Sequence, residues 1–209
     1  VYKRGRRYVH SPDQEYDKKL ARISQSKAQC QAEPERFVFL YEDEFTFFRP
    51  PRVGFAYAAK GARGIKASGV GTQTRRIAAC LDIRTGAVIA RQRGGFPVQE
   101  MYHFFRYVER HYPKAERIFI AVDNWPVHFH PFVAENLAKQ RSRIQLLSLP
   151  TYAPWTNPTE KIWLKLCQEV LDQHPFGRDW RGLQQAIAEW FKPLEQGSAS
   201  LLHFVGLSP

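Results

Sequence analysis

The chain has 209 residues, of which 44% are hydrophobic and 14% aromatic, enough to build one large domain with an appended arm. Its 31 Lys and Arg residues against 20 Asp and Glu residues give a formal net charge of +11, which suits a polyanionic partner better than a small acidic metabolite. No apolar run approaches the roughly 18 residues that a membrane-spanning helix needs, so no membrane partner is expected.

The cysteines and the chain start bear on compartment and completeness. Cys30, Cys80 and Cys167 are odd in number and lack the spacing of a disulfide framework or a zinc site, which favours a reducing, cytoplasmic setting. The chain opens on VYKRGRRY without an apolar signal segment, and its only methionine is Met101. We therefore expect this sequence to be part of a longer protein.

Residues 1–35 are polar and charged, beginning with a basic cluster and continuing as SPDQEYDKKLARISQSKAQ, which predicts one modest helix. We interpret residues 1–35 as a basic arm or linker and residues 36–209 as the main domain. A solvated linker and a DNA-contacting arm agree equally well with this charge pattern.

The next segments predict strands followed by a helix. Residues 37–41 are continuously apolar, as in a strand buried on both faces. Residues 44–76 mix aromatic, Gly, Pro and basic residues, which predicts a strand end and then an irregular excursion. Residues 77–81 and 87–90 flank the turn-forming DIRTG and predict a hairpin. Apolar residues at helical spacing predict a helix over residues 97–112.

The second half alternates strands and helices, as parallel sheets do. Strands are predicted at residues 118–122 and 144–149, with a helix at 130–140 between them and helices at 157–171 and 178–191 after them. This order predicts an α/β fold with a mixed sheet, three antiparallel strands and then two parallel strands, flanked by helices. The first and fourth strands can lie side by side in it.

Three acidic residues stand out against this background. Asp43 and Asp123 follow apolar runs of strand length, and Glu160 lies just inside a helix start, so the fold can bring all three to one sheet edge. Mg²⁺ prefers oxygen ligands of this kind, and two such ions can clamp the reacting oxygens of a phosphodiester. The same residues also have structural interpretations: Asp123 and Asn124 form a common turn pair, and Asn157, Pro158 and Glu160 resemble a capping box.

Other residues near these acids are less specific. His128 and His130 can suggest a transition-metal site, but a histidine that orients a carboxylate or contacts a phosphate fits this context better. A second group consists of basic residues interleaved with glycines, which can follow a nucleic-acid backbone or form a solvated loop. Its members are Lys60, Arg63, Lys66, Arg75 and Arg76.

Taken together, YEDEF, IAVDNWPVH and LPTYAPWTNPTEKIW resemble the catalytic domain of DDE transposases of the mariner-like superfamily, in particular the bacterial insertion-sequence branch. That family carries an Asp-Glu pair after its first strand, an Asp-Asn-x-x-x-His element after its fourth, and a Tyr-Ser-Pro-x-x-Asn-Pro-Ile-Glu element opening a helix. Here 36 residues separate Asp123 from Glu160, within the family's usual range. The resemblance covers about residues 12–192.

The resemblance implies a ribonuclease H-like fold and a metal-binding catalytic triad of Asp43, Asp123 and Glu160. It implies two Mg²⁺ ions, for which Mn²⁺ can substitute, that serve first to hydrolyse a phosphodiester at a transposon end and then to join the 3′-hydroxyl to target DNA. Matching motif positions make four residues candidates for accessory roles. They are Glu44, Asn124, His128 and Asn157.

The implied partners are transposon-end and target DNA and, because two ends must be joined, a second copy of the chain on DNA. A bacterial cytoplasmic protein associated with the nucleoid is expected, with a DNA-binding domain upstream of residue 1. Two alternatives stay open: another ribonuclease H-like nuclease, which would not join strands, and an inactive transposase-derived module for DNA binding or assembly, which would bind DNA without metal-dependent nicking.

Overall fold

The computed structural model describes residues 10–52, 60–61 and 71–207. Their strands form one five-stranded sheet in the order β3-β2-β1-β4-β5. The strands are β1 (Phe37–Phe48), β2 (Thr74–Asp82), β3 (Val88–Arg93), β4 (Arg117–Val122) and β5 (Ile144–Ser148). The first three pair antiparallel, whereas β1, β4 and β5 pair parallel. The predicted mixed sheet, with the first and fourth strands adjacent, is confirmed.

Strands β1 and β2 are longer than predicted. The sequence predicted an irregular excursion over residues 44–76, but β1 continues to Phe48 and β2 already begins at Thr74. These extensions pair with each other in an antiparallel register that ends with Phe48 opposite Thr74. Cross-strand pairing therefore overrides the weak local signal, and Asp43 lies within a strand rather than after its end.

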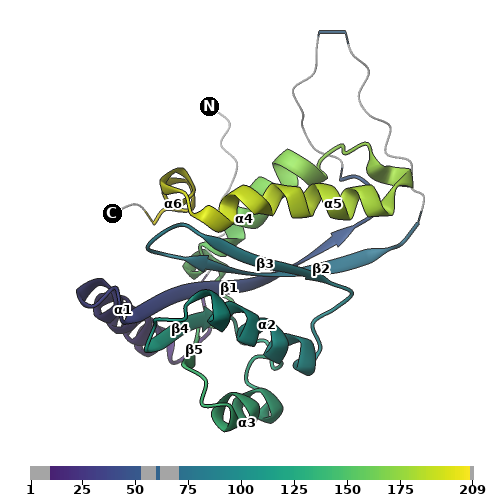
Figure 1. The fold of residues 1–209 in the computed structure, drawn as a ribbon. Helices are drawn as coiled ribbons and strands as arrows, with labels where there is room; N and C mark the ends of the chain where they lie inside the picture. The colour runs from purple at the N-terminus through teal and green to yellow at the C-terminus, as the bar shows by residue number, and fades with distance from the viewer. Residues whose placement is uncertain (1–9, 53–59, 62–70, 208–209) are drawn as a thin grey trace.

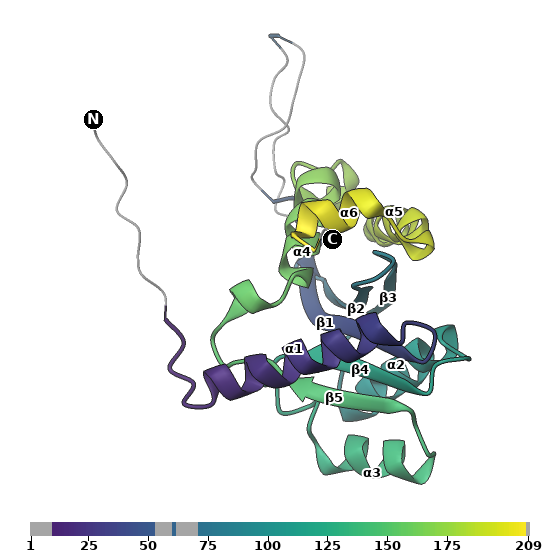
Figure 2. The same ribbon diagram turned by 90° about the vertical axis from the view of Figure 1, so that its left-hand side faces the viewer.

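Helices cover both faces of the sheet (Figures 1 and 2). They are α1 (Tyr16–Ala32), α2 (Val98–His111), α3 (Pro131–Lys139), α4 (Thr159–Leu166), α5 (Trp180–Phe191) and α6 (Ala199–Val205). Helices α4, α5 and α6 lie on one side of the sheet, and α2 and α3 lie on the other. The sequence had predicted no element for α6, whose Leu201 and Val205 join the core beneath α4 and α5.

Helix α1 is part of the packed domain. Its Ile23 and Cys30 are buried in one cluster with Phe39 and Tyr41 of β1. The linker interpretation therefore does not describe residues 16–32, because this helix covers apolar strand residues that would otherwise face water. Segment 16–32 adds a layer to the domain predicted for residues 36–209.

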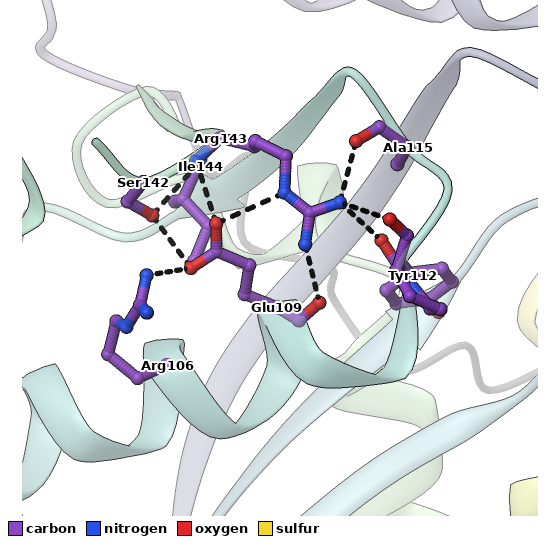
Figure 3. Close-up of polar contacts among 8 residues, drawn as sticks. Arg106, Glu109, Tyr112, Ala115, Ser142, Arg143 and Ile144 are labelled. Carbon is purple, nitrogen blue, oxygen red and sulfur yellow. Dashed lines mark hydrogen bonds and ion pairs between the residues drawn. The ribbon is translucent and has the colours of Figure 1, made fainter. Parts of the chain in front are cut away.

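A buried polar network joins α2 to the starts of β4 and β5 (Figure 3). The carboxylate of Glu109 accepts hydrogen bonds from the Arg143 backbone N–H at 2.8 Å and the Ser142 hydroxyl at 3.0 Å. The Arg143 guanidinium in turn donates to the carbonyls of Tyr112 at 2.8 Å and Ala115 at 2.7 Å. Because Asp123 follows the other end of β4, this network fixes the sheet at the end remote from the three acids.

Among the described residues, no helix is long and apolar enough to cross a membrane.

Candidate active site

The parallel register of β1 and β4 brings Asp43 and Asp123 together. Tyr41 of β1 is the partner of Ala121 of β4, and each aspartate lies two residues beyond its member of this pair. Neighbouring strands are about 4.8 Å apart, so the two carboxylates emerge from adjacent positions. Their adjacency, predicted from the strand order, thus follows from equal offsets along two parallel strands.

The pleat of β1 leaves Asp43 between two apolar clusters. Alternate residues share a face, and on this face Phe39 and Tyr41 pack with α1 whereas Phe45 and Phe47 pack with α4 and α5. Asp43 lies between these two pairs, at the point on this face of β1 where the cover by α1 ends and the cover by α4 and α5 begins. A carboxylate can be tolerated there because it faces a cleft rather than a packed core.

Glu160 enters from the first turn of α4. The side-chain amide of Asn157 donates to the Glu42 carbonyl of β1 at 3.0 Å, and its oxygen accepts the Thr159 backbone N–H at 3.2 Å. The Asn157 N–H donates to the carbonyl of Pro154, so the reciprocal bond of a capping box is not formed. Asn157 therefore ties the helix start to β1, and among the residues described here the Glu160 carboxylate has no hydrogen-bond or ion-pair partner.

All three acids line one cleft of about 400 Å³. The loop after β4 contributes Asn124 and Trp125 to its wall, and the loop after β5 contributes Tyr152, whose side chain is 77% exposed. The structure therefore brings together the residues that the sequence nominated from three separate segments. The exposed ring of Tyr152 and the half-buried ring of Trp125 are flat surfaces on which a base can stack.

Uncompensated negative charge is the main electrostatic feature of this cleft. Burial, together with repulsion from Glu160, raises the pKa of Asp43 to about 7 although the Trp163 indole N–H donates to Asp43 at 2.8 Å. Burial and the charge of Asp123 likewise raise the pKa of Glu160. Carboxylates that repel one another in this way would be stabilised by a cation among them.

Asp123 differs because it has donors of its own. Burial would raise the pKa of this carboxyl, but hydrogen bonds from His128 and from the Trp125 backbone N–H outweigh it and hold the pKa below its usual value. The Trp125 bond is 2.8 Å long and forms the turn that the sequence suggested. The turn and the cleft-facing carboxylate are thus two properties of one residue.

His128 links Asp123 to acids on the opposite face of β1. Its ring lies 3.2 Å from a carboxylate oxygen of Asp123, 2.9 Å from Glu44 and 3.3 Å from Glu42. Burial alone would lower the pKa of His128, but these acids raise it to about 11. The prediction that His128 orients a carboxylate agrees with this geometry.

Glu42, Glu44 and His128 also form a group whose atoms are close enough to hold a metal ion. The ring of His128 already bonds Glu44, and the side chains of Glu42 and His128 are fully buried. Protonated His128 offsets part of the negative charge of this cluster, and burial raises the pKa of Glu42, whose two oxygens have no hydrogen bond among the described residues, well above its usual value. We therefore regard the cluster as the support of Asp123.

Two other polar residues that the sequence singled out, Asn124 and His130, form local hydrogen bonds. Asn124 donates to the Leu149 carbonyl at 2.7 Å and so ties the loop after β4 to that after β5. His130 is separate from His128, because its ring caps α3 by accepting the Phe132 N–H. The structure thus assigns a bonding partner to each of these polar residues outside the acidic triad.

Of the basic residues nominated for DNA contact, the structure describes Lys60, Arg75 and Arg76. Arg75 and Arg76 are successive residues of β2 and therefore face opposite sides of the sheet, with Arg75 bonded to Gln184 and Arg76 placed 5.3 Å over the Trp125 ring. Lys60 is exposed. Arg63 and Lys66 lie outside the described residues.

Sequence reasoning missed two contributors to the site. Trp163 is 4% exposed and was assigned only to the apolar side of its helix, yet its N–H holds Asp43. Glu42 was not nominated, yet its carboxylate lies 3.3 Å from His128. An indole three residues after Glu160 on the same helical side was the available signal for Trp163.

Comparison with known proteins agrees with this geometry. A family model described as DDE superfamily endonuclease matches residues 38–180. The chain belongs to this DDE endonuclease family. The expected DDE family is thereby confirmed, and the expected ribonuclease H-like fold is confirmed by the solved structures described next.

Individual relatives of this DDE domain are distant. The insertion element IS630 uncharacterized 39 kDa protein of Shigella sonnei is 23% identical over 203 residues, covering 96% of this chain and 58% of that protein. The Mos1 transposase paired-end complex with the left transposon end has a TM-score of 0.66 at 17% identity, covering 99% of this chain and 62% of the Mos1 chain. The Mos1 mariner catalytic domain has a TM-score of 0.60 at 14% identity, and the match covers 99% of this chain and 94% of that domain. This chain therefore spans less than two thirds of its first two relatives but nearly all of that catalytic domain.

Proposed function

We propose that this DDE domain cleaves DNA phosphodiester bonds at transposon ends and transfers the resulting 3′-hydroxyl to target DNA. The observation that carries the proposal is the convergence of Asp43, Asp123 and Glu160 on one cleft from β1, the loop after β4 and α4. Membership of the DDE endonuclease family supports it. The net charge of +11 suits a DNA substrate.

The cleft fits divalent metal ions. Its three acids supply only oxygen donors, and their mutual repulsion raises the pKa values of Asp43 and Glu160, which a cation would reverse. Among the described residues no Lys or Arg forms an ion pair with any of the three. When bound, two Mg²⁺ or Mn²⁺ ions would polarise the phosphate and lower the pKa of a water molecule.

The chain's own residues hold the acids in position for this chemistry. Trp163 donates to one oxygen of Asp43, and the Glu44 N–H donates to the other at 2.9 Å. His128 and the Trp125 N–H keep Asp123 ionised and aimed into the cleft. Asn157 fixes the helix start that carries Glu160. The site is therefore organised before ligand binds, as electrostatic catalysis of phosphoryl transfer requires.

The partners follow from the same proposal. The substrate is transposon-end DNA and then target DNA, and two copies of the chain assemble on DNA so that two ends can be joined. The Mos1 relative in its paired-end complex with a transposon end supports DNA as the partner.

A plasmid assay tests the proposal. Supercoiled plasmid carrying candidate transposon ends is incubated with the chain, extended upstream, and Mg²⁺ or Mn²⁺, with Ca²⁺ as the unreactive control. Nicking and 3′-end joining are expected for the unmodified protein and for Glu135→Gln, an exposed control on α3, but not for Glu160→Gln. Nicking without joining would favour a simple nuclease, and binding without nicking would favour an inactive module.

A further inference from the structure

An arginine-rich groove of about 410 Å³ lies between β3 and α2. Four arginines line it, and Glu100 is the single carboxylate among the described residues of its lining. Arg91 and Arg93 come from β3, and Arg106 and Arg110 come from α2. Helix α2, which forms one wall of the groove, lies on the side of the sheet opposite α4 and α5 (Figure 1). The groove shares no lining residue with the cleft of the three acids.

The sequence spacing explains why these side chains meet. Arg91 and Arg93 are two residues apart on a strand and so share a face, which is the face toward α2. Arg106 and Arg110 are four residues apart on a helix and so lie one above the other. Two rows of guanidinium groups therefore border the same groove. Strand β3 is the edge strand of the described sheet, so the groove lies at the border of the sheet.

The strand register connects this groove to the cleft. Arg93 is the direct cross-strand partner of Arg76 on β2. The guanidinium of Arg76 lies 5.3 Å over the ring of Trp125, which lines the acidic cleft. Like charges directly opposite each other on two strands are unfavourable, and an anion above them would relieve the repulsion. A path of arginines thus leads from the rim of the cleft to the groove.

The four groove arginines differ in their partners. Arg93 pairs with Glu100 at 3.1 Å, and Arg106 pairs with the buried Glu109. Arg91 instead lies 3.7 Å over the ring of Tyr107, and neither Arg91 nor Arg110 has an ion pair among the residues that the structure describes. Arg91 and Arg110 are therefore available to an external anion.

We infer that this groove binds the phosphate backbone of the DNA that enters the acidic cleft, with Arg76 as the link between the two. The inference rests on the proposed DNA-cleaving function. Guanidinium groups bind phosphate oxygens in a two-pronged geometry, and rows of them follow a backbone without reading its sequence. An acidic protein would also match the charge of the groove, but the proposed function places a DNA phosphate in the cleft where the path ends. A DNA strand extends along the whole path because one of its phosphates reacts there.

Salt-dependent DNA binding tests the inference. The chain is titrated against a labelled short duplex without divalent metal, over about 50 to 200 mM salt. The Arg91→Gln/Arg110→Gln variant is compared with Arg117→Gln/Arg181→Gln, which removes two exposed arginines elsewhere. Removing one arginine that neutralises a phosphate lowers the steepness of log K against log salt by about 0.9. The slope of the groove variant should therefore fall by about 2, and that of the control should stay unchanged.

Several outcomes would overturn it. They are an unchanged salt dependence in the groove variant, an equal decrease in the control, or displacement of the duplex by poly-glutamate as effective as displacement by unlabelled DNA. Circular dichroism and thermal unfolding of both variants exclude misfolding as the cause. Because the proposed cleavage requires divalent metal and this titration omits it, the result is separate from the nicking assay. A protein that never nicks can still show the groove contacts.

Discussion

Replacing Glu109 with glutamine should destabilise the domain by about 3 kcal/mol. The side chain is 6% exposed, and its carboxylate accepts bonds from Arg106, Ser142 and both the backbone and the guanidinium of Arg143 (Figure 3). Glutamine keeps the shape but turns an NH₂ group toward these donors and leaves Arg143 without its counter-charge. Breaking a buried pair costs about 3–5 kcal/mol, and the low end applies because backbone carbonyls still hold Arg143.

Urea unfolding at neutral pH measures the effect, and thermal unfolding should show a Tm lower by about 6–12 °C. Glu135→Gln removes a pair with Lys139 in which the side chains are 63% and 68% exposed, and should change stability by less than about 0.5 kcal/mol. This control separates the loss of a buried pair from the loss of a charge.

The pH dependence supplies an independent check. Burial would raise the pKa of Glu109, but the hydrogen bonds from Arg143 and Ser142 and the charge of Arg106 hold it below its usual value. A lowered folded-state pKa means that the stabilisation is complete above the unfolded-state pKa of about 4.3 and is lost as the pH falls through the folded value. The wild-type advantage over Glu109→Gln should therefore shrink below about pH 4. A difference that persists unchanged at about pH 3, or that is below about 0.5 kcal/mol at pH 7, would refute the reasoning.

Three further predictions concern the site and its frame. Trp163→Phe removes the N–H donor to Asp43, so the pKa of that carboxyl should rise above about 7. Mn²⁺ binding, measured by calorimetry at pH 7, should therefore weaken. Unchanged affinity would contradict the role assigned to the indole. Asn157→Ala removes the hydrogen bonds from its side chain to a buried carbonyl and a helix N–H, so the free energy of unfolding measured in urea should fall by about 2 kcal/mol. Metal-dependent nicking should also be lost, and full activity would show that the helix start needs no such tie. Gly86→Ala should lower the free energy of unfolding by about 2 kcal/mol or more without affecting metal binding. Gly86 has a φ of +71°, and an added Cβ would lie 2.4 Å from the Ser198 carbonyl oxygen. An unchanged free energy of unfolding would mean that this turn shifts freely.

Much of the site was readable from local patterns. Apolar runs predicted the strands that carry Asp43 and precede Asp123, and the order of elements predicted that these strands are neighbours. The segment around Asn157 and Glu160 predicted a helix start, which the structure confirms at Thr159. Such features are encoded within a few residues of each other, so composition and periodicity report them.

Other features depended on which segments meet. The sequence predicted an irregular chain after Glu44 because its residues are mixed in character, yet pairing with residues 74–77 extends β1 to Phe48. It also treated the helix at 16–32 as part of a linker, because nothing in its own composition shows that Phe39 and Tyr41 need cover. Long-range pairing and burial decide such cases, and neither is visible in a local window.

The identity of the three acids could be proposed from motifs, whereas their electrostatic state could not. Strand register places Asp43 and Asp123 two residues beyond the paired Tyr41 and Ala121. Alternation along β1 turns Asp43 toward the cleft and turns Glu44 away from it, toward His128. The link between the arginine groove and the cleft likewise exists only because Arg93 pairs opposite Arg76. The sequence determines the residue types of the site and their spacing along the chain. Strand register and packing determine the distances between charged groups. Electrostatic energies and pKa values depend on those distances and on burial, so they cannot be read from sequence position.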